Sequence, residues 1–167
     1  MKDTIRWTAT KIARRLELIE PLVYRNRSPL APFSYKRLDG YLSSLQGVPE
    51  TQDEEWTVIP AGTYWGEWYT DFALRSQFTV PQDWDPSIPA VLYLLVGESG
   101  YFCHPEALVF IDGEPCTSCD RYHQEVILPR SFQDGRAHSL ALIGWTGIRD
   151  IASGLNTRLY MQPCYIV

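Results

Sequence analysis

An acid, a guanidinium, a phenol and an imidazole occupy four successive positions, Asp120, Arg121, Tyr122 and His123. Asp and His are residue types that carry acid–base chemistry, and a glycosidase needs two carboxylates that flank the bond it breaks. A structural interpretation is equally available, in which Asp120 and Arg121 form an ion pair that closes the loop and His123 is hydrogen-bonded beside it. We take Asp120, Arg121 and His123 as candidate contacts to a carbohydrate or to another domain.

Cys116 and Cys119 form a Cys-x-x-Cys pair just before this cluster. A structural zinc site needs two further ligands, and the nearest ones are Cys103, His104 and His123. The chain has no second Cys-x-x-Cys, and no βαβ pattern typical of redox proteins surrounds the pair. We therefore favour free thiols in a turn and predict no metal ligands, and we keep a zinc-stabilised interaction domain as an alternative.

Trp65 and Trp68 belong to the aromatic run Trp65-Gly66-Glu67-Trp68-Tyr69. Sugar-binding proteins stack the apolar face of a pyranose on such rings, beside polar groups that bind the hydroxyls. Aromatic residues also fill the cores of sandwiches and the contacts between domains, and we expect this to be the commoner role. Trp65 and Trp68 are kept as candidate carbohydrate or domain contacts.

The elements that must hold these residues are mostly strands. Short apolar runs separated by Gly, Pro and Asp turn residues continue from Trp56 to the last residue, and Asp112-Gly113 is a strong hairpin signal. This spacing, without long helices between the strands, predicts an antiparallel β-sandwich of the jelly-roll type. The expected strands are Trp56–Ile59, Trp68–Val80, Ala90–Val96, Ala107–Ile111, Glu125–Leu128, Arg136–Ile143 and Thr157–Val167.

A helical arm is expected before the sandwich. Residues 3–20 have apolar residues at helical spacing, and Pro21 should end this helix. Its apolar stripe needs a partner surface, on the sandwich or outside this chain. The Pro-containing residues 21–54 predict an irregular connection with a short helix near Leu38–Leu45. We thus divide the chain into an arm, 1–54, and a sandwich, 55–167. The stripe consists of Ile5, Ile12, Leu16 and Ile19.

Four stretches of this chain, in order, resemble the N-terminal non-catalytic region of glycoside hydrolase family 38 α-mannosidases, in the cytosolic and vacuolar branch. The resemblance covers roughly residues 55–147. It implies a jelly-roll, galactose-binding-domain-like sandwich that precedes a separate catalytic domain. It also implies that zinc or another divalent metal belongs to that catalytic domain, with no cofactor in this chain. The stretches are Trp68–Leu74, Phe78–Pro81, Ala107–Pro115 and Asp120–Glu125.

Composition limits the classes of partner. The 167 residues carry a net charge of −5, which argues against nucleic acid as a ligand. No apolar run approaches the roughly 20 residues that span a bilayer, and the first residues lack the apolar segment of a signal peptide. We therefore expect a cytoplasmic protein with free cysteines that does not bind membranes.

These observations lead to one main prediction about function and two alternatives. The main prediction is an accessory sandwich domain of an α-mannosidase that contributes to assembly and to the rim of the active site, and is not itself catalytic. Its expected partners are the catalytic domain of the parent enzyme, a second copy of the chain, and carbohydrate. The alternatives are an independent carbohydrate-binding module and the zinc-stabilised domain already described.

Overall fold

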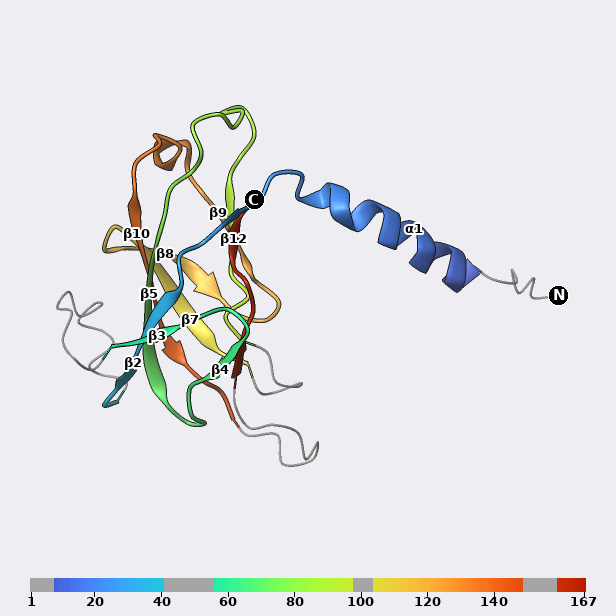
Figure 1. Ribbon diagram of the computed structural model, residues 1–167. Coiled ribbons are helices and arrows are strands. Elements are labelled where there is room, and N and C mark those ends of the chain that lie inside the picture. Colours follow the sequence, from blue (N-terminus) through green and yellow to red (C-terminus); the bar gives the residue numbers. More distant parts are fainter. Residues whose placement is uncertain (1–7, 41–55, 98–103, 149–158) are drawn as a thin grey trace.

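The computed structural model describes residues 8–40, 56–97, 104–148 and 159–167. Within these residues a single α-helix, α1 (Thr8–Val23), projects from a body of β-strands (Figure 1). The strands are β1 (Ser28–Pro29), β2 (Phe33–Leu38), β3 (Thr57–Ile59), β4 (Thr63–Trp65), β5 (Asp71–Phe78), β6 (Val91–Tyr93), β7 (Glu106–Ile111), β8 (Glu114–Cys119), β9 (Glu125–Ile127), β10 (His138–Trp145), β11 (Leu159–Met161) and β12 (Tyr165–Ile166), with a short 3-10 helix, η1 (Arg130–Phe132), before β10.

The strands form two main sheets, and every pair in them is antiparallel. One sheet has the order β3-β2-β5-β10-β7-β8, and the other has the order β1-β12-β6-β9. A third, two-stranded sheet pairs β11 with β4. The protein is thus mainly β, with the antiparallel sheets of a β-sandwich, as predicted. β6 lies inside its sheet, between β12 and β9.

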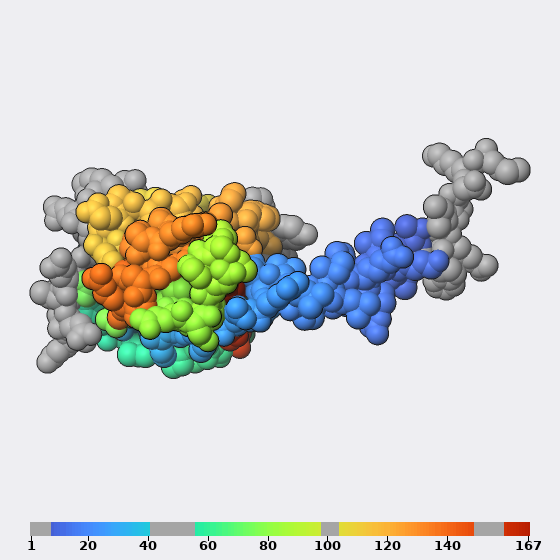
Figure 2. Space-filling model, turned by 90° about the horizontal axis from the view of Figure 1, so that it is seen from above, coloured from blue at the N-terminus to red at the C-terminus, as the bar shows by residue number. Residues whose placement is uncertain are grey.

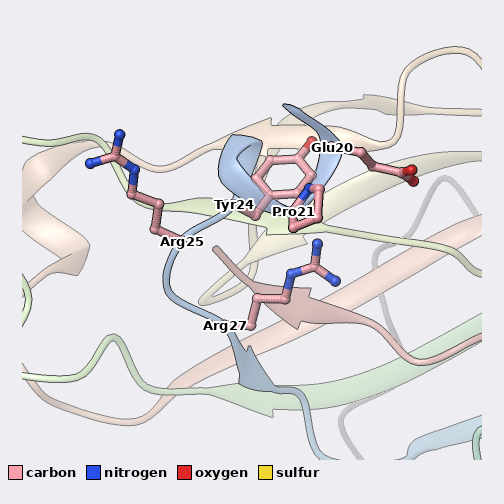
Figure 3. Close-up of a pocket in the computed structure, with 5 residues that line it drawn as sticks. All are labelled: Glu20, Pro21, Tyr24, Arg25 and Arg27. Atoms are coloured by element: carbon pink, nitrogen blue, oxygen red, sulfur yellow. The ribbon is translucent and has the colours of Figure 1, made fainter. Parts of the chain in front are cut away.

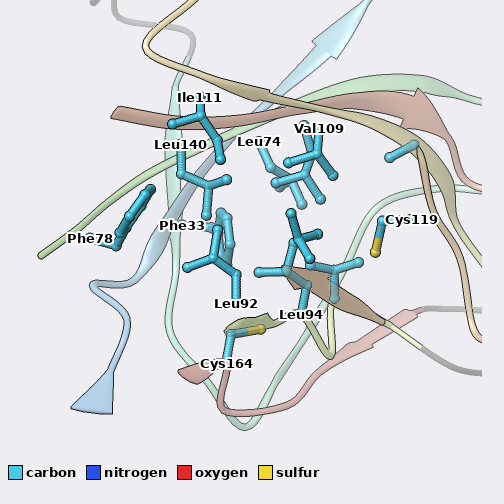
Figure 4. Close-up of a cluster of buried hydrophobic side chains, with 14 of the residues drawn as sticks. Phe33, Leu74, Phe78, Leu92, Leu94, Val109, Ile111, Cys119, Leu140 and Cys164 are labelled. Atoms are coloured by element: carbon cyan, nitrogen blue, oxygen red, sulfur yellow. The ribbon is translucent and has the colours of Figure 1, made fainter. Parts of the chain in front are cut away.

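The core lies between the two main sheets. Val109, Leu140 and Leu142 come from the six-stranded sheet, and Leu92 and Ile166 come from the other. All five are fully buried. Figure 4 shows Val109, Leu140 and Leu92 among these core side chains. Burial of one such side chain is worth about 1.5–3 kcal/mol. The alternating apolar residues of these strands therefore bind the two sheets together.

The Asp112-Gly113 turn joins β7 to β8 as predicted. Two residues separate Ile111 from Glu114, and both have positive φ, 51° for Asp112 and 83° for Gly113. Positive φ at both central positions is the geometry of a type I′ hairpin, and it explains why Asp and Gly stand there. The hairpin places β8 at the edge of the six-stranded sheet, directly before the Asp120–His123 segment.

The arm is shorter than the sequence predicted. β1 and β2 lie within the residues assigned to it, yet β2 pairs with β5 and with β3 inside the six-stranded sheet. Phe33, at the start of β2, is buried in the core. The division at residue 55 was therefore wrong, and the sandwich begins at β1. Leu38 of the expected short helix is the last residue of β2, and residues 41–55 lie outside the described residues.

Pro21 does not end α1, which continues to Val23. Proline removes one backbone hydrogen bond, but this loss falls in the last turn, where the helix terminates soon afterwards. The residues before Thr8 lie outside the described residues. No helix in the described part of the chain is long and apolar enough to cross a membrane.

Candidate functional site

The Asp120–His123 loop connects the edge strand β8 of one sheet with the edge strand β9 of the other. Asp120 and His123 form an isolated antiparallel bridge, with reciprocal backbone hydrogen bonds of 3.3 Å and 3.2 Å. This bridge closes the segment into a tight turn. Arg121 and Tyr122 occupy the tip of the turn, so the backbone holds their positions.

The Asp120 carboxylate fixes the same turn from within. Its Oδ1 accepts the backbone N–H groups of Tyr122 at 2.7 Å and of His123 at 2.9 Å. The His123 Nδ1 donates to both carboxylate oxygens at 3.0 Å. Partial burial raises the pKa of Asp120, but these hydrogen bonds outweigh it, and the net pKa lies below its ordinary value. Asp120 is therefore an ionised structural acceptor, which is unsuited to the role of a general acid.

His123 is a hydrogen-bond partner of the Asp120 carboxylate, as the structural interpretation of the sequence expected. The expected Asp120–Arg121 ion pair stays a prediction. The Arg121 guanidinium lies over the Tyr122 ring, with 5.2 Å from its Cζ to the ring centroid. Arg121 is thus placed beside an aromatic face.

Tyr122 is exposed, with 71% of its surface accessible. Its ring contacts the Arg121 guanidinium, and it lies in a T-shaped arrangement with the ring of His104 at 6.2 Å between centroids. The Nδ1 of His104 is buried without a hydrogen-bond partner among the described residues. Tyr122 was missing from the candidate residues named from sequence. An aromatic residue in a short polar loop between strands is the signal that could have identified it.

Trp65 and Trp68, the other candidates, lie with the core. Trp65 is only 2% exposed, and its Nε1 donates to the Val96 carbonyl at 2.8 Å. Trp68 is half-buried and packs against the same core. Its Nε1 is buried and has no partner within the described residues. Trp65 therefore offers no face to a sugar. The exposed aromatic residue at the candidate site is Tyr122.

The Cys-x-x-Cys pair lies within β8 and not in a turn. Cys116 is exposed and Cys119 is buried, so the two thiols face different environments. Burial, followed by the charge of Asp120, raises the pKa of Cys119 to about 12. A zinc ligand must be deprotonated, and such a thiol resists deprotonation. Among the described residues, no group of three or more His, Cys, Asp or Glu side chains could hold a metal ion.

A second set of contacts anchors the arm next to the loop. The Tyr24 hydroxyl donates to Glu125, the first residue of β9, and the Tyr24 ring lies 5.1 Å from that of Tyr93. Burial and this hydrogen bond raise the pKa of Tyr24, so the phenol stays protonated as the donor. Arg27 lies 5.7 Å from the Tyr24 ring and 5.8 Å from the Tyr165 ring. The helix is thereby tied to β9, two residues beyond the loop.

A shallow hollow opens at this junction, where the helix meets the strands (Figure 3). In the figure the Tyr24 ring and Pro21 lie side by side, while the guanidinium of Arg25 points away from that of Arg27. The two cations therefore do not converge on one ligand. The hollow forms because the helix is held against the strands at Tyr24. Its lining residues are Glu20, Pro21, Tyr24, Arg25 and Arg27.

A further titratable cluster lies at the start of β10. The buried His138 ring donates from Nδ1 to Asp112 at 2.7 Å and from Nε2 to Asp134 at 3.1 Å. Burial lowers the pKa of His138, but the two carboxylates outweigh it and raise the pKa above its ordinary value. Phe78 and Phe132 pack against the ring at 5.4 Å and 4.9 Å. The enclosed imidazole joins the β7–β8 turn to β10, which is a structural role.

No protein-family model matches this chain, and a search of curated proteins finds no significant match.

Proposed function

We propose that this chain is an accessory, non-catalytic N-terminal domain of an α-mannosidase, with the jelly-roll, galactose-binding-domain-like form of the β-sandwich. A separate zinc-dependent catalytic domain hydrolyses terminal α-mannosides. The sandwich contributes to assembly of the enzyme and forms part of the rim of its active site. The proposed location is the cytoplasm, and the free thiols of Cys116, Cys119 and Cys164 suit a reducing compartment.

The segments that resemble family 38 enzymes lie close together in the fold, and this supports the proposal. Trp68–Leu74 leads into β5, Phe78–Pro81 contains its last residue, and Ala107–Pro115 covers most of β7 and the start of β8. β5 and β7 are the two neighbours of β10 in the six-stranded sheet. The resembling segments therefore share one sheet. Asp120–Glu125 follows directly as the loop and the first residue of β9.

The observation that carries the proposal is the pre-ordered loop tip. Asp120 and His123 fix the backbone, and this leaves Arg121 and Tyr122 presented at the end of the sandwich. A stacked Arg–Tyr pair on a fixed turn suits a protein interface, because Arg and Tyr are enriched among residues that dominate binding energy. Contact with a catalytic domain requires just such a surface.

Kinetics of loop variants test this role. In the full-length product of the gene, Tyr122→Ala should lower kcat/KM for an aryl α-mannoside by about tenfold or more, as truncation of an interface anchor costs about 2 kcal/mol. The melting temperature of the sandwich should stay the same, because Tyr122 is exposed. Tyr64→Ala is the matched control, since Tyr64 is an exposed tyrosine on β4. Equal kcat/KM for wild type and Tyr122→Ala would refute the contact.

The second candidate function is an independent carbohydrate-binding module, which the exposure of Tyr122 favours. A sugar ring could stack on Tyr122 while Arg121 and His123 bind hydroxyl groups. Calorimetric titration of the isolated chain with mannose oligosaccharides separates the two functions. Saturable binding that Tyr122→Ala abolishes supports the module, and its absence leaves the accessory domain as the better account.

A further inference from the structure

The apolar face of α1 is exposed along its whole length. Ile12, Leu16, Ile19 and Val23, here called the seam, follow one another in steps of four, three and four residues. Each is more than half exposed, between 52% and 61%. Steps of four and three are the spacing of the a and d positions of a coiled coil. In this register Ile12 and Ile19 are d positions, and Leu16 and Val23 are a positions.

The helix needs a partner to be stable. It has 16 residues, none of them is buried, and Pro21 removes one of its hydrogen bonds. Isolated helices of such length are only marginally stable in water. The sandwich does not supply the partner surface, because α1 stands away from it as a separate rod (Figure 2). The partner must therefore come from another molecule or from another part of a larger protein.

The charged residues beside the seam are complementary to those of a second copy of α1. Arg15 is at position g and Glu20 at position e of the following heptad. In a parallel pair of helices, g of one chain faces the e that lies five residues later in the other. Arg15 of each copy then faces Glu20 of a neighbouring copy, and an ion pair forms. No ion pair within the described residues occupies either side chain, whereas Arg14, on the outer face, pairs with Glu17 at 2.7 Å.

An antiparallel pair lacks this complementarity. There g faces g and e faces e, so Arg15 lies opposite Leu22 and Glu20 lies opposite Ala13 of the second copy. Pro21 is at position f, which points away from the seam in both arrangements. The charge pattern therefore selects the parallel arrangement.

We propose that copies of this chain associate through α1 as a short parallel coiled coil with the Ile12, Leu16, Ile19 and Val23 seam at its centre. Leu at an a position with Ile at d positions favours three or four helices over two. Tyr24 anchors each helix to its sandwich directly after Val23. The sandwiches therefore lie at the same end of the coiled coil. With only four seam residues from each chain, association is weak and depends on concentration. This proposal does not depend on the α-mannosidase activity.

Sedimentation velocity of the full chain over a wide range of concentration tests the association, with circular dichroism to follow helix content. A reversible equilibrium between monomer and a small oligomer is expected, and Leu16→Asp should abolish it while the sandwich remains folded. Arg15→Glu and Glu20→Arg should each weaken association by about fivefold to tenfold, because the attractive pairs between neighbouring helices become repulsive. Lys11→Glu is the control, since Lys11 lies at position c and its reversal should leave the equilibrium unchanged.

Mixing the two charge variants tests the direction of the helices. Arg15→Glu and Glu20→Arg chains should each be mostly monomeric alone, and an equal mixture should associate about as well as wild type, because all facing charges are then opposite. A chain that stays monomeric at every concentration would overturn the proposal, and so would an oligomer that neither Leu16→Asp nor the charge reversals affect. Helix formation on anionic phosphatidylserine vesicles without self-association would instead assign the seam to a membrane surface.

Discussion

Replacement of His138 by glutamine should destabilise the sandwich in a way that depends on pH. The protonated ring makes two hydrogen bonds to carboxylates, each worth about 1.5–3 kcal/mol when charge-assisted. Asp112 is 47% exposed and Asp134 is 28% exposed, so solvent screening favours the lower end of this range. Glutamine can donate one neutral bond of about 1 kcal/mol. The net loss at acidic pH should therefore be about 1–2 kcal/mol.

The direction in which stability changes with pH follows from the direction of the pKa shift of His138. The folded pKa of His138 lies above its unfolded value of about 6.5. Its stabilising contribution is therefore fully present below about pH 6.5, and it is lost as pH rises through the folded pKa. The pKa values of Asp112 and Asp134 are lowered, so both stay charged in this range. Above the folded pKa, the neutral ring can donate only one of the two bonds.

Urea denaturation followed by tryptophan fluorescence measures this difference between wild type and His138→Gln. The difference in unfolding free energy should be about 1–2 kcal/mol at pH 5.5 and should fall below about 1 kcal/mol at about pH 8.5. His123→Gln is the comparison at an exposed site, because the side chain of His123 is 73% exposed and solvent screens its hydrogen bonds to Asp120, so the effect on stability should be smaller than for His138→Gln. A difference for His138→Gln that stays constant across this pH range would refute the charged hydrogen-bond bridge.

Two further predictions concern the sheet and the thiols. Gly144→Ala should lower the free energy of unfolding by about 1–3 kcal/mol in urea denaturation, because a Cβ there would lie 2.1 Å from the Glu106 carbonyl oxygen in the adjacent strand; unchanged stability would show that β7 and β10 can move apart freely. Peptide mapping after alkylation of the native protein should find Cys116 modified well before Cys119 and Cys164, whose pKa values burial raises to about 12. Equal rates would mean that the buried thiols are accessible.

The sheets were the part of the fold that the sequence predicted best. Alternating apolar residues and Gly or Asp turns are local patterns, and the Asp112-Gly113 hairpin formed where they placed it. The expected strand over residues 157–167 is divided into β11 and β12, with Pro163 between them. β4 was not predicted, because three residues in an aromatic run carry little periodic signal.

Long-range pairing explains what the sequence could not provide. β2 joins the six-stranded sheet through β5, a partner more than thirty residues later in the chain. The proline residues around it indicated an irregular arm, and nothing local identified that partner. The same holds for the candidate site. The four residues of the loop were visible in the sequence, but the burial of Trp65 depends on tertiary contacts.

Activity of the full-length gene product tests the central claim most directly. We predict that it hydrolyses an aryl α-mannoside, that a zinc chelator abolishes this turnover and added zinc restores it, and that the isolated 167-residue chain has none under the same conditions. Absence of hydrolysis by the full-length product with zinc present would contradict the assignment to an α-mannosidase. Turnover by the isolated chain that Asp120→Asn abolishes would contradict the accessory role and place catalysis in the loop itself.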